Sequence, residues 1–253
     1  NMTISSNGGE IINRGKIENC RERQVVDKRD LTILSGGGSI TNAGEISADE
    51  DLAMRSYGGL IVNHKGGRVS SRSNTGLYSS GGPIGNHGEI SADEDLTMRS
   101  YGGIITNDGS ISACKINVAA FQMTNSKDKK VIAQGDMKIK TSKTIMKRII
   151  SFLFSKAELD ERPQLINEGT LLSIGQMSLW SGYKILNDGL GVIESRVGLK
   201  IVSTKLFANF KRVISTDILE LHAPWFANHK DLGSVEGPLA LRVSSKLSNE
   251  KYI

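Results

Sequence analysis

The sequence repeats itself almost letter for letter at one fixed interval. Residues 45–59 read EISADEDLAMRSYGG, and residues 89–103 read EISADEDLTMRSYGG, so that Ile46 and Ile90 are 44 positions apart. An internal repeat restricts the fold more than any other feature, because each unit must pack against copies of itself. The interval is too long for one strand–turn unit and divides into two units of about 22 residues.

A shorter unit becomes visible when asparagine is taken as its anchor. An apolar residue stands two places before the Asn, and Gly often stands two places after it, as in Ile40-Thr41-Asn42-Ala43-Gly44. From Asn42 onward the steps between anchors are 21, 23, 21, 18, 42, 20, 22 and 19, and the first step is 29. Ten of the sixteen asparagines share this register. They are Asn13, Asn42, Asn63, Asn86, Asn107, Asn125, Asn167, Asn187, Asn209 and Asn228.

Units of this length, rich in Gly, Asn, Ser and aliphatic residues, predict an all-β fold: a parallel β-helix of about ten coils in one domain over residues 1–253. Apolar and polar residues alternate with period two in 44–48 and 88–92, as in half-buried strands. An α-solenoid needs longer, helix-forming repeats, and the Leu-x-x-Leu-x-Leu spacing of leucine-rich repeats is absent. We expect Val69 to align with Ile46 and Ile90.

The anchor residues predict a ladder at one corner of the coil. Stacked Asn side chains can hydrogen-bond from coil to coil and tolerate the left-handed backbone of a turn. The Gly that follows is expected to supply a positive φ. Gly pairs such as Gly58-Gly59 and Gly102-Gly103 are expected to mark a second corner.

The composition excludes several classes of protein. Gly is abundant (28 of 253) while Pro is rare (4), which argues against collagen and against a Pro-rich linker. The net charge of +5 permits an acidic partner without requiring one. We find no apolar run long enough for a spanning helix and no recognisable signal peptide, and the chain reads as a piece of a longer protein.

Two segments interrupt the repeat. Residues 18–33 are rich in Arg, Lys and Asp and are expected to form a solvated loop. Residues 141–163 combine apolar residues at helical spacing with Lys and Arg, which predicts an inserted amphipathic helix that ends before Pro163. That helix either packs on the wall of the β-helix or contacts a membrane or partner. The candidate contact residues are Ile145, Lys147, Arg148, Ile149, Phe152 and Leu153.

Residues with catalytic or metal-binding chemistry are few. His64 and His87 should stack on adjacent coils, but no third metal ligand accompanies them. The triplets 49–51 and 93–95 could be carboxylates of a glycoside hydrolase, although a charge ladder of Asp49, Arg72 and Asp93 is the simpler interpretation.

Cys20 and Cys114 should lie about four coils, or about 19 Å, apart, so both thiols are expected to be free. We expect no catalytic residue, metal or cofactor.

The repeat sequence, an Asn-x-Gly turn followed by Glu45-Ile46-Ser47-Ala48, resembles repeats of the filamentous haemagglutinin type. These occur in large exoproteins of Gram-negative bacteria, including contact-dependent inhibition toxins. The resemblance spans roughly residues 7–247 and is strongest in 36–113. It implies a right-handed β-helix, two-partner secretion, and a role in adhesion or toxin delivery. No secretion-domain motif or toxin domain is recognised, so the resemblance implies an interior section of a shaft.

Three functions are therefore open. The leading hypothesis is a non-catalytic, secreted shaft at the bacterial cell surface, associated with the outer membrane. Its partners would be a receptor or glycan on a host or neighbouring cell, and adjoining β-helix segments of a longer chain; nucleic acid is not expected. The alternatives are a polysaccharide-binding or polysaccharide-degrading β-helix, and a module that binds a membrane or partner through 141–163.

Overall fold

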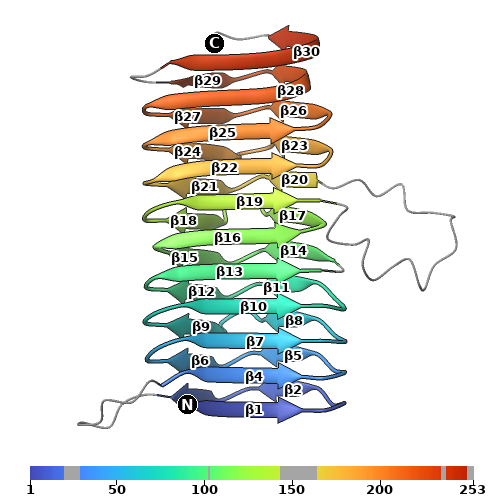
Figure 1. The fold of residues 1–253 in the computed structure, drawn as a ribbon, viewed down its shortest axis with the longest axis vertical. Coiled ribbons are helices and arrows are strands. Elements are labelled where there is room, and N and C mark those ends of the chain that lie inside the picture. The colour runs from blue at the N-terminus through green and yellow to red at the C-terminus, as the bar shows by residue number, and fades with distance from the viewer. Residues whose placement is uncertain (20–28, 102, 143–163, 235–237, 250–253) are drawn as a thin grey trace, which may run out of the picture.

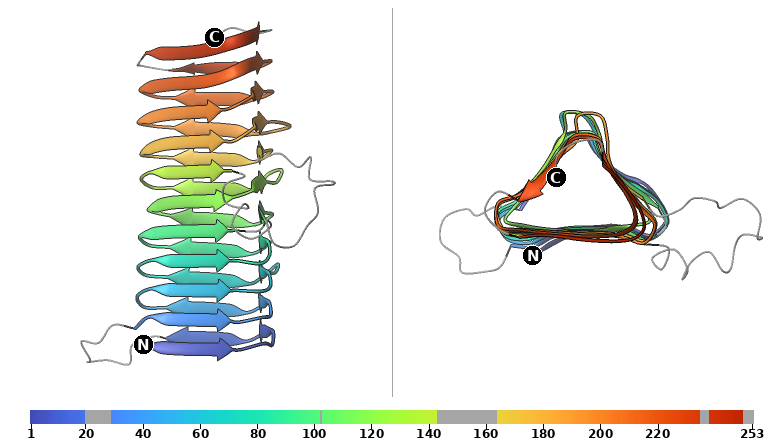
Figure 2. Two further views of the ribbon diagram at one scale, coloured as in Figure 1. Left: turned by 45° about the vertical axis from the view of Figure 1, so that its right-hand side comes forward. Right: turned by 90° about the horizontal axis from the view of Figure 1, so that it is seen from above.

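The chain forms a right-handed parallel β-helix of ten stacked coils. The structure is a computed structural model that describes residues 1–19, 29–101, 103–142, 164–234 and 238–249. Figure 1 shows the front strands running one way and the back strands returning as the chain climbs from the N-terminus. Seen from above, the coils superimpose into a triangle (Figure 2). The predicted fold class is thereby confirmed, and the described residues contain strands but no helix.

Each coil contributes three strands, which build three faces. The first face consists of β1 (Met2–Ser6), β4 (Leu31–Ser35), β7 (Leu52–Ser56), β10 (Thr75–Ser79), β13 (Asp95–Ser100), β16 (Lys115–Ala120), β19 (Met137–Thr141), β22 (Gln176–Ser181) and β25 (Gly198–Ser203). The second face consists of β2 (Ile11–Asn13), β5 (Ile40–Asn42), β8 (Ile61–Asn63), β11 (Ile84–Asn86), β14 (Ile104–Asn107), β17 (Gln122–Asn125), β20 (Gln164–Asn167), β23 (Lys184–Asn187) and β26 (Leu206–Asn209).

The third face is a separate ten-stranded sheet. Its strands are β3 (Lys16–Asn19), β6 (Glu45–Ala48), β9 (Arg68–Ser71), β12 (Glu89–Ala92), β15 (Ser110–Ala113), β18 (Lys130–Ala133), β21 (Thr170–Ser173), β24 (Val192–Ser195), β27 (Arg212–Ser215) and β29 (Asp231–Ser234). The long strands β28 (Ile218–Asn228) and β30 (Leu239–Asn249) each pass through a corner, and β28 pairs with both β25 and β26. All described pairings are parallel, and Ile46, Val69 and Ile90 stand in one register, as predicted.

The core is a column of aliphatic side chains along the axis. Alternate residues of the strands point inward, so that Leu52, Met54 and Ile90 are each about 1% exposed. In the next coil Leu77 takes the place of Met54, and Ile111 takes that of Ile90. A single coil could not bury such a face alone, whereas stacked coils bury it continuously. Phe207 and Phe226 stack in register, with ring centroids 5.6 Å apart, near the C-terminal end.

The first corner, between the first and second faces, is built from Ser and Gly. Ser56 Oγ donates to the carbonyl oxygens of Gly38 and Gly59, at 2.9 and 2.8 Å. A Cβ on Gly58 would lie 2.6 Å from the carbonyl oxygen of Gly37 in the coil below. The Gly pairs therefore mark a corner, as predicted, and only Gly lets successive backbones approach so closely there.

The interruptions are shorter than the sequence suggested where the structure describes them. Glu18 and Asn19 belong to β3, and Leu31 already begins β4, so 18–33 is not a loop throughout. Thr141 is the last residue of β19. The amphipathic helix proposed for 141–163, with all six of its candidate contact residues, falls almost wholly in 143–163, outside the described residues.

Candidate functional site: the asparagine corner

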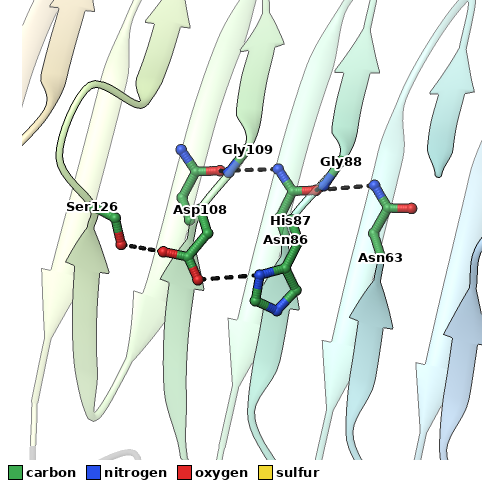
Figure 3. Close-up of polar contacts among 8 residues, drawn as sticks. Asn63, Asn86, His87, Gly88, Asp108, Gly109 and Ser126 are labelled. Carbon is green, nitrogen blue, oxygen red and sulfur yellow. Dashed lines mark hydrogen bonds and ion pairs between the residues drawn. The ribbon is translucent and has the colours of Figure 1, made fainter. Parts of the chain in front are cut away.

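The second corner, between the second and third faces, holds the ten anchor asparagines. Each ends a strand of the second face, where the alternation that buries Ile84 also turns Asn86 inward. All ten are at most 6% exposed. Nine consecutive side-chain hydrogen bonds of 2.8–2.9 Å link them from Asn13 to Asn228, and Figure 3 shows the bond between Asn63 and Asn86.

The side-chain amides of this asparagine ladder from Asn13 to Asn209 are used fully. The Oδ1 of Asn86 accepts from Nδ2 of Asn63 at 2.9 Å and from the backbone N–H of Gly88 at 3.2 Å. Its Nδ2 donates to Oδ1 of Asn107 and to the carbonyl oxygen of Ser110. A buried amide whose donors and acceptor are all occupied stabilises the coil stack and has no group left for a ligand. The ladder is structural.

The glycine of the Asn-x-Gly turn has the predicted positive φ in one described turn, Asn187-Asp188-Gly189, and lacks it in the other described turns of this type. Among the described glycines only Gly66 (φ 83°) and Gly189 (φ 56°) have a positive φ. A Cβ on Gly88 would instead lie 2.1 Å from the carbonyl oxygen of Gly67, and on Gly109 it would lie 2.0 Å from that of Gly88. The requirement for Gly is close approach between coils, because any side chain would collide with the backbone below.

The outside of this corner forms a shallow groove of about 460 Å³. His87 Nδ1 lies 3.2 Å from Asp108 Oδ2, and Ser126 Oγ donates to Asp108 Oδ1, as Figure 3 shows. The carboxylate stands between the serine and the histidine, so the imidazole cannot take the serine proton as it does in a Ser-His-Asp triad. His87 and Asp108 are also about 40% exposed, which suits a solvated link between coils.

The other histidines and cysteines do not assemble into a site. In the described part of the chain, no three His, Cys, Asp or Glu residues are placed to hold a metal ion. His229 stacks on Phe210 with ring centroids 4.6 Å apart. Cys114 is free and exposed, while Cys20 lies outside the described residues.

The acidic triplets lie at the third corner, between the third face and the next first face. Arg72 pairs with Asp49 at 3.3 Å, which is one of the two links of the charge ladder expected there. Asp51 Oδ1 accepts from the backbone N–H and the Nδ2 of Asn74, and Asn74 Oδ1 accepts from the backbone N–H of Asp95. This ion pair and these hydrogen bonds connect successive coils.

Sequence reasoning missed this acidic ladder, made of Asp30, Asp51, Asn74 and Asp95. Its signal is an Asp or Asn at the start of the first strand of four successive coils, or just before it. The side chains of Asp30, Asp51 and Asn74 each accept from the backbone N–H of the next residue in the series. The steps between these residues are 21, 23 and 21, the same as those between the stacked asparagines from Asn42 to Asn107.

Sequence reasoning also missed a pattern on the first face. Arg55 lies over the ring of Tyr78, with Cζ 4.9 Å from the centroid, and Lys140 lies over Trp180 at 5.1 Å. All four side chains point outward in one column. At the first corner of the upper coils, Lys205 lies 5.4 Å from the ring centroids of both Tyr183 and Trp225.

Comparison of the chain with protein-family models, with curated proteins and with solved structures finds no match. In the residues that the structure describes, no helix has the length and apolarity needed to cross a bilayer. The observations that bear on function are therefore the coil stack and its surfaces.

Proposed function

We propose that this chain is a non-catalytic shaft, an interior section of a secreted bacterial exoprotein that holds other parts of that protein away from the cell surface. The observation that carries the proposal is the unbroken asparagine ladder of nine hydrogen bonds between Asn13 and Asn228. It joins ten successive coils by the same buried contact.

Such a stack suits a mechanical role. Bending or shearing it would break the parallel hydrogen bonds of three strands per coil together with an Asn rung and the Ser–Gly contacts of the first corner. Ten coils at about 4.8 Å give a rod of about 48 Å. Because the coils share one register, the rod can be lengthened by adding coils without changing its cross-section.

The resemblance to filamentous haemagglutinin-type repeats supports an exported, surface-exposed location. A free Cys114 is compatible with export through a pore in an unfolded state, for which disulfides bring no benefit. In such an exoprotein the shaft would place an adhesive or toxic region against a receptor or glycan on a host or neighbouring cell.

A length series tests this function. Residues 46–89 span two coils, and their removal joins Glu45 to Ile90 so that the sequence EISADEDL is restored at the splice. We would place exoproteins that lack this segment, or carry one to four copies of it, on the bacterial surface. The reach of a distal epitope would be measured by electron microscopy, together with binding to target cells.

A shaft predicts that reach changes by about 10 Å per segment, that export is unaffected, and that binding to target cells varies with reach. A matched control keeps the length constant and replaces Ser47 and Ser91, outward residues of the third face, with Thr. Cell binding that is indifferent to length would contradict the proposal.

A further inference from the structure

The first face presents an outward column of side chains that contains no carboxylate in the described coils. Successive members are in register from one coil to the next. The column consists of Ser5, Leu34, Arg55, Tyr78, Arg99, Ala119, Lys140, Trp180, Val202, His222 and Arg242. We call it the basic column.

The neighbouring outward column on the same face adds Lys138 and Lys200 and a single acid, Glu220. Lys200 Nζ donates to Glu220 at 2.8 Å, and this bond lowers the pKa of the carboxyl. The negative charge of this one carboxylate is therefore balanced by Lys200. Over their described strands, the two columns therefore hold six Lys and Arg residues against one carboxylate.

The third face also carries Lys and Arg side chains in columns, but it differs from the first face in its number of carboxylates. Its outward side chains also form two columns. Over the described strands these two columns of the third face hold four Lys and Arg residues and five carboxylates. Arg68 pairs with Glu89 at 3.0 Å, and Lys16 pairs with Glu18. Positive charge therefore prevails in these two columns of the first face, whereas carboxylates balance it on the third face.

Two of the four Lys and Arg residues of the basic column are held by aromatic rings. Tyr78 and Trp180 are half-buried, with Arg55 and Lys140 over their rings at 4.9 and 5.1 Å. A cation held by a ring on one side still offers its other side to an anionic oxygen, and it loses less side-chain entropy on binding. The same contact covers the ring, which disfavours stacking of a nucleic-acid base.

From this arrangement we propose that the first face binds an extended polyanionic polysaccharide, bearing uronate or sulfate groups, with its chain parallel to the axis of the β-helix. The column is straight, and Arg55 and Arg99 are two coils, or about 10 Å, apart. In many linear polyanionic polysaccharides the charge recurs on every second sugar, which suits cations on every second coil. This inference goes beyond the proposed shaft and does not depend on it.

The test compares two triple variants of the whole chain. The first carries Arg55→Ser, Arg99→Ser and Lys140→Ser in the basic column. The matched control carries Arg68→Ser, Lys130→Ser and Arg212→Ser on the third face. Both lose three positive charges, and thermal melting confirms that both fold. Binding to heparin, polygalacturonate, dextran, and single- and double-stranded DNA would be measured at several salt concentrations.

We expect salt-dependent binding to heparin or polygalacturonate, no binding to dextran, and weaker binding to DNA. The basic-column variant should lose at least about tenfold in affinity, equivalent to about 1.4 kcal/mol, while the control changes less than about threefold. Preference for heparin over polygalacturonate would assign sulfate as the recognised group, and the reverse would assign uronate. Equal losses in both variants, tighter binding to DNA, or no binding by the parent chain would overturn the proposal.

Discussion

Two side-chain ladders climb the same β-helix, one inside the second corner and one outside the third. The asparagine ladder is buried and keeps the same residue type in all ten coils. The acidic ladder is exposed or half-buried and changes from Asp30, Asp51, Asn74 and Asp95 in the lower coils to Lys115 in the next. Both bond one coil to the next, yet only one is continuous.

The difference is explained by access to water. A buried amide that loses its partner has nothing to replace the bond, whereas an exposed carboxylate or amide can hydrogen-bond to solvent. Substitution at one rung of the asparagine ladder therefore leaves the buried amides of the adjacent rungs without a hydrogen-bond partner, which favours the same residue in every coil. The exposed ladder tolerates change because each rung can be lost separately.

The largest effect is expected in β12, which connects the two ladders. Ile90→Asp places a charge in the core, where Ile90 is 1% exposed, at a cost of several kcal/mol. We expect no cooperative thermal transition by circular dichroism. Ser91→Asp, on the outward side of the same strand, should melt like the parent. Normal melting of Ile90→Asp would contradict the inward assignment.

The next prediction compares one residue type in both ladders. Asn86→Ala removes four hydrogen bonds of a buried amide and should lower the free energy of unfolding by about 3 kcal/mol. Asn74→Ala removes the side-chain bonds to Asp51 and to the backbone N–H of Asp95, which water can replace, and should cost about 0.5 kcal/mol. Chemical denaturation measures both, and equal losses would mean that burial does not distinguish the ladders.

Two glycines of the second corner differ in the space available for a side chain. A Cβ on Gly44 would lie 1.9 Å from the carbonyl oxygen of Gly15, whereas a Cβ on Gly15 meets nothing within 4 Å. Gly44→Ala should therefore cost about 1–3 kcal/mol through overpacking, and Gly15→Ala should cost less than about 0.5 kcal/mol. Amide hydrogen exchange in β5 and β6 reports both, and a similar response from the two variants would point to backbone conformation instead of stacking.

The smallest effect concerns an exposed pair on the first face. The hydrogen bond from Lys200 lowers the pKa of Glu220 below its ordinary value of 4.5, with further contributions from the charges of Lys200, His222 and Arg242. A lowered pKa stabilises the fold above the unfolded-state pKa, and this contribution is lost as pH falls through the folded-state value.

Lys200→Met should move the Glu220 pKa upward, toward 4.5, in an NMR titration, while Lys138→Met in the same column serves as the control. An unchanged Glu220 pKa in Lys200→Met would mean that the bond is not populated in solution.

The sequence predicted the fold because each coil repeats the same inward residues. The aliphatic–x–Asn pattern aligned Ile46, Val69 and Ile90, and the Gly pairs marked a corner. The role of Gly88 was predicted wrongly, since contacts between coils cannot be read from one turn considered alone.

The basic column was missed for another reason. A column is a property of register, and its members are separated by uneven steps in the sequence. Lys140 and Trp180 are adjacent coil partners although forty residues separate them along the chain. Outward residues vary from coil to coil because the core does not constrain them, so no repeated residue type in the sequence indicates which of them are in register.

Hydrogen exchange of the side-chain amides is a direct test of whether the anchor asparagines form one buried ladder. NMR of the chain labelled with ¹⁵N-Asn would compare the inner rungs, Asn42 to Asn209, with Asn74 and with Asn117, an outward, half-buried residue of β16. The account predicts that the inner rungs exchange as slowly as the backbone amides of the core strands, while Asn74 and Asn117 exchange rapidly. Equally rapid exchange at the inner rungs would contradict it.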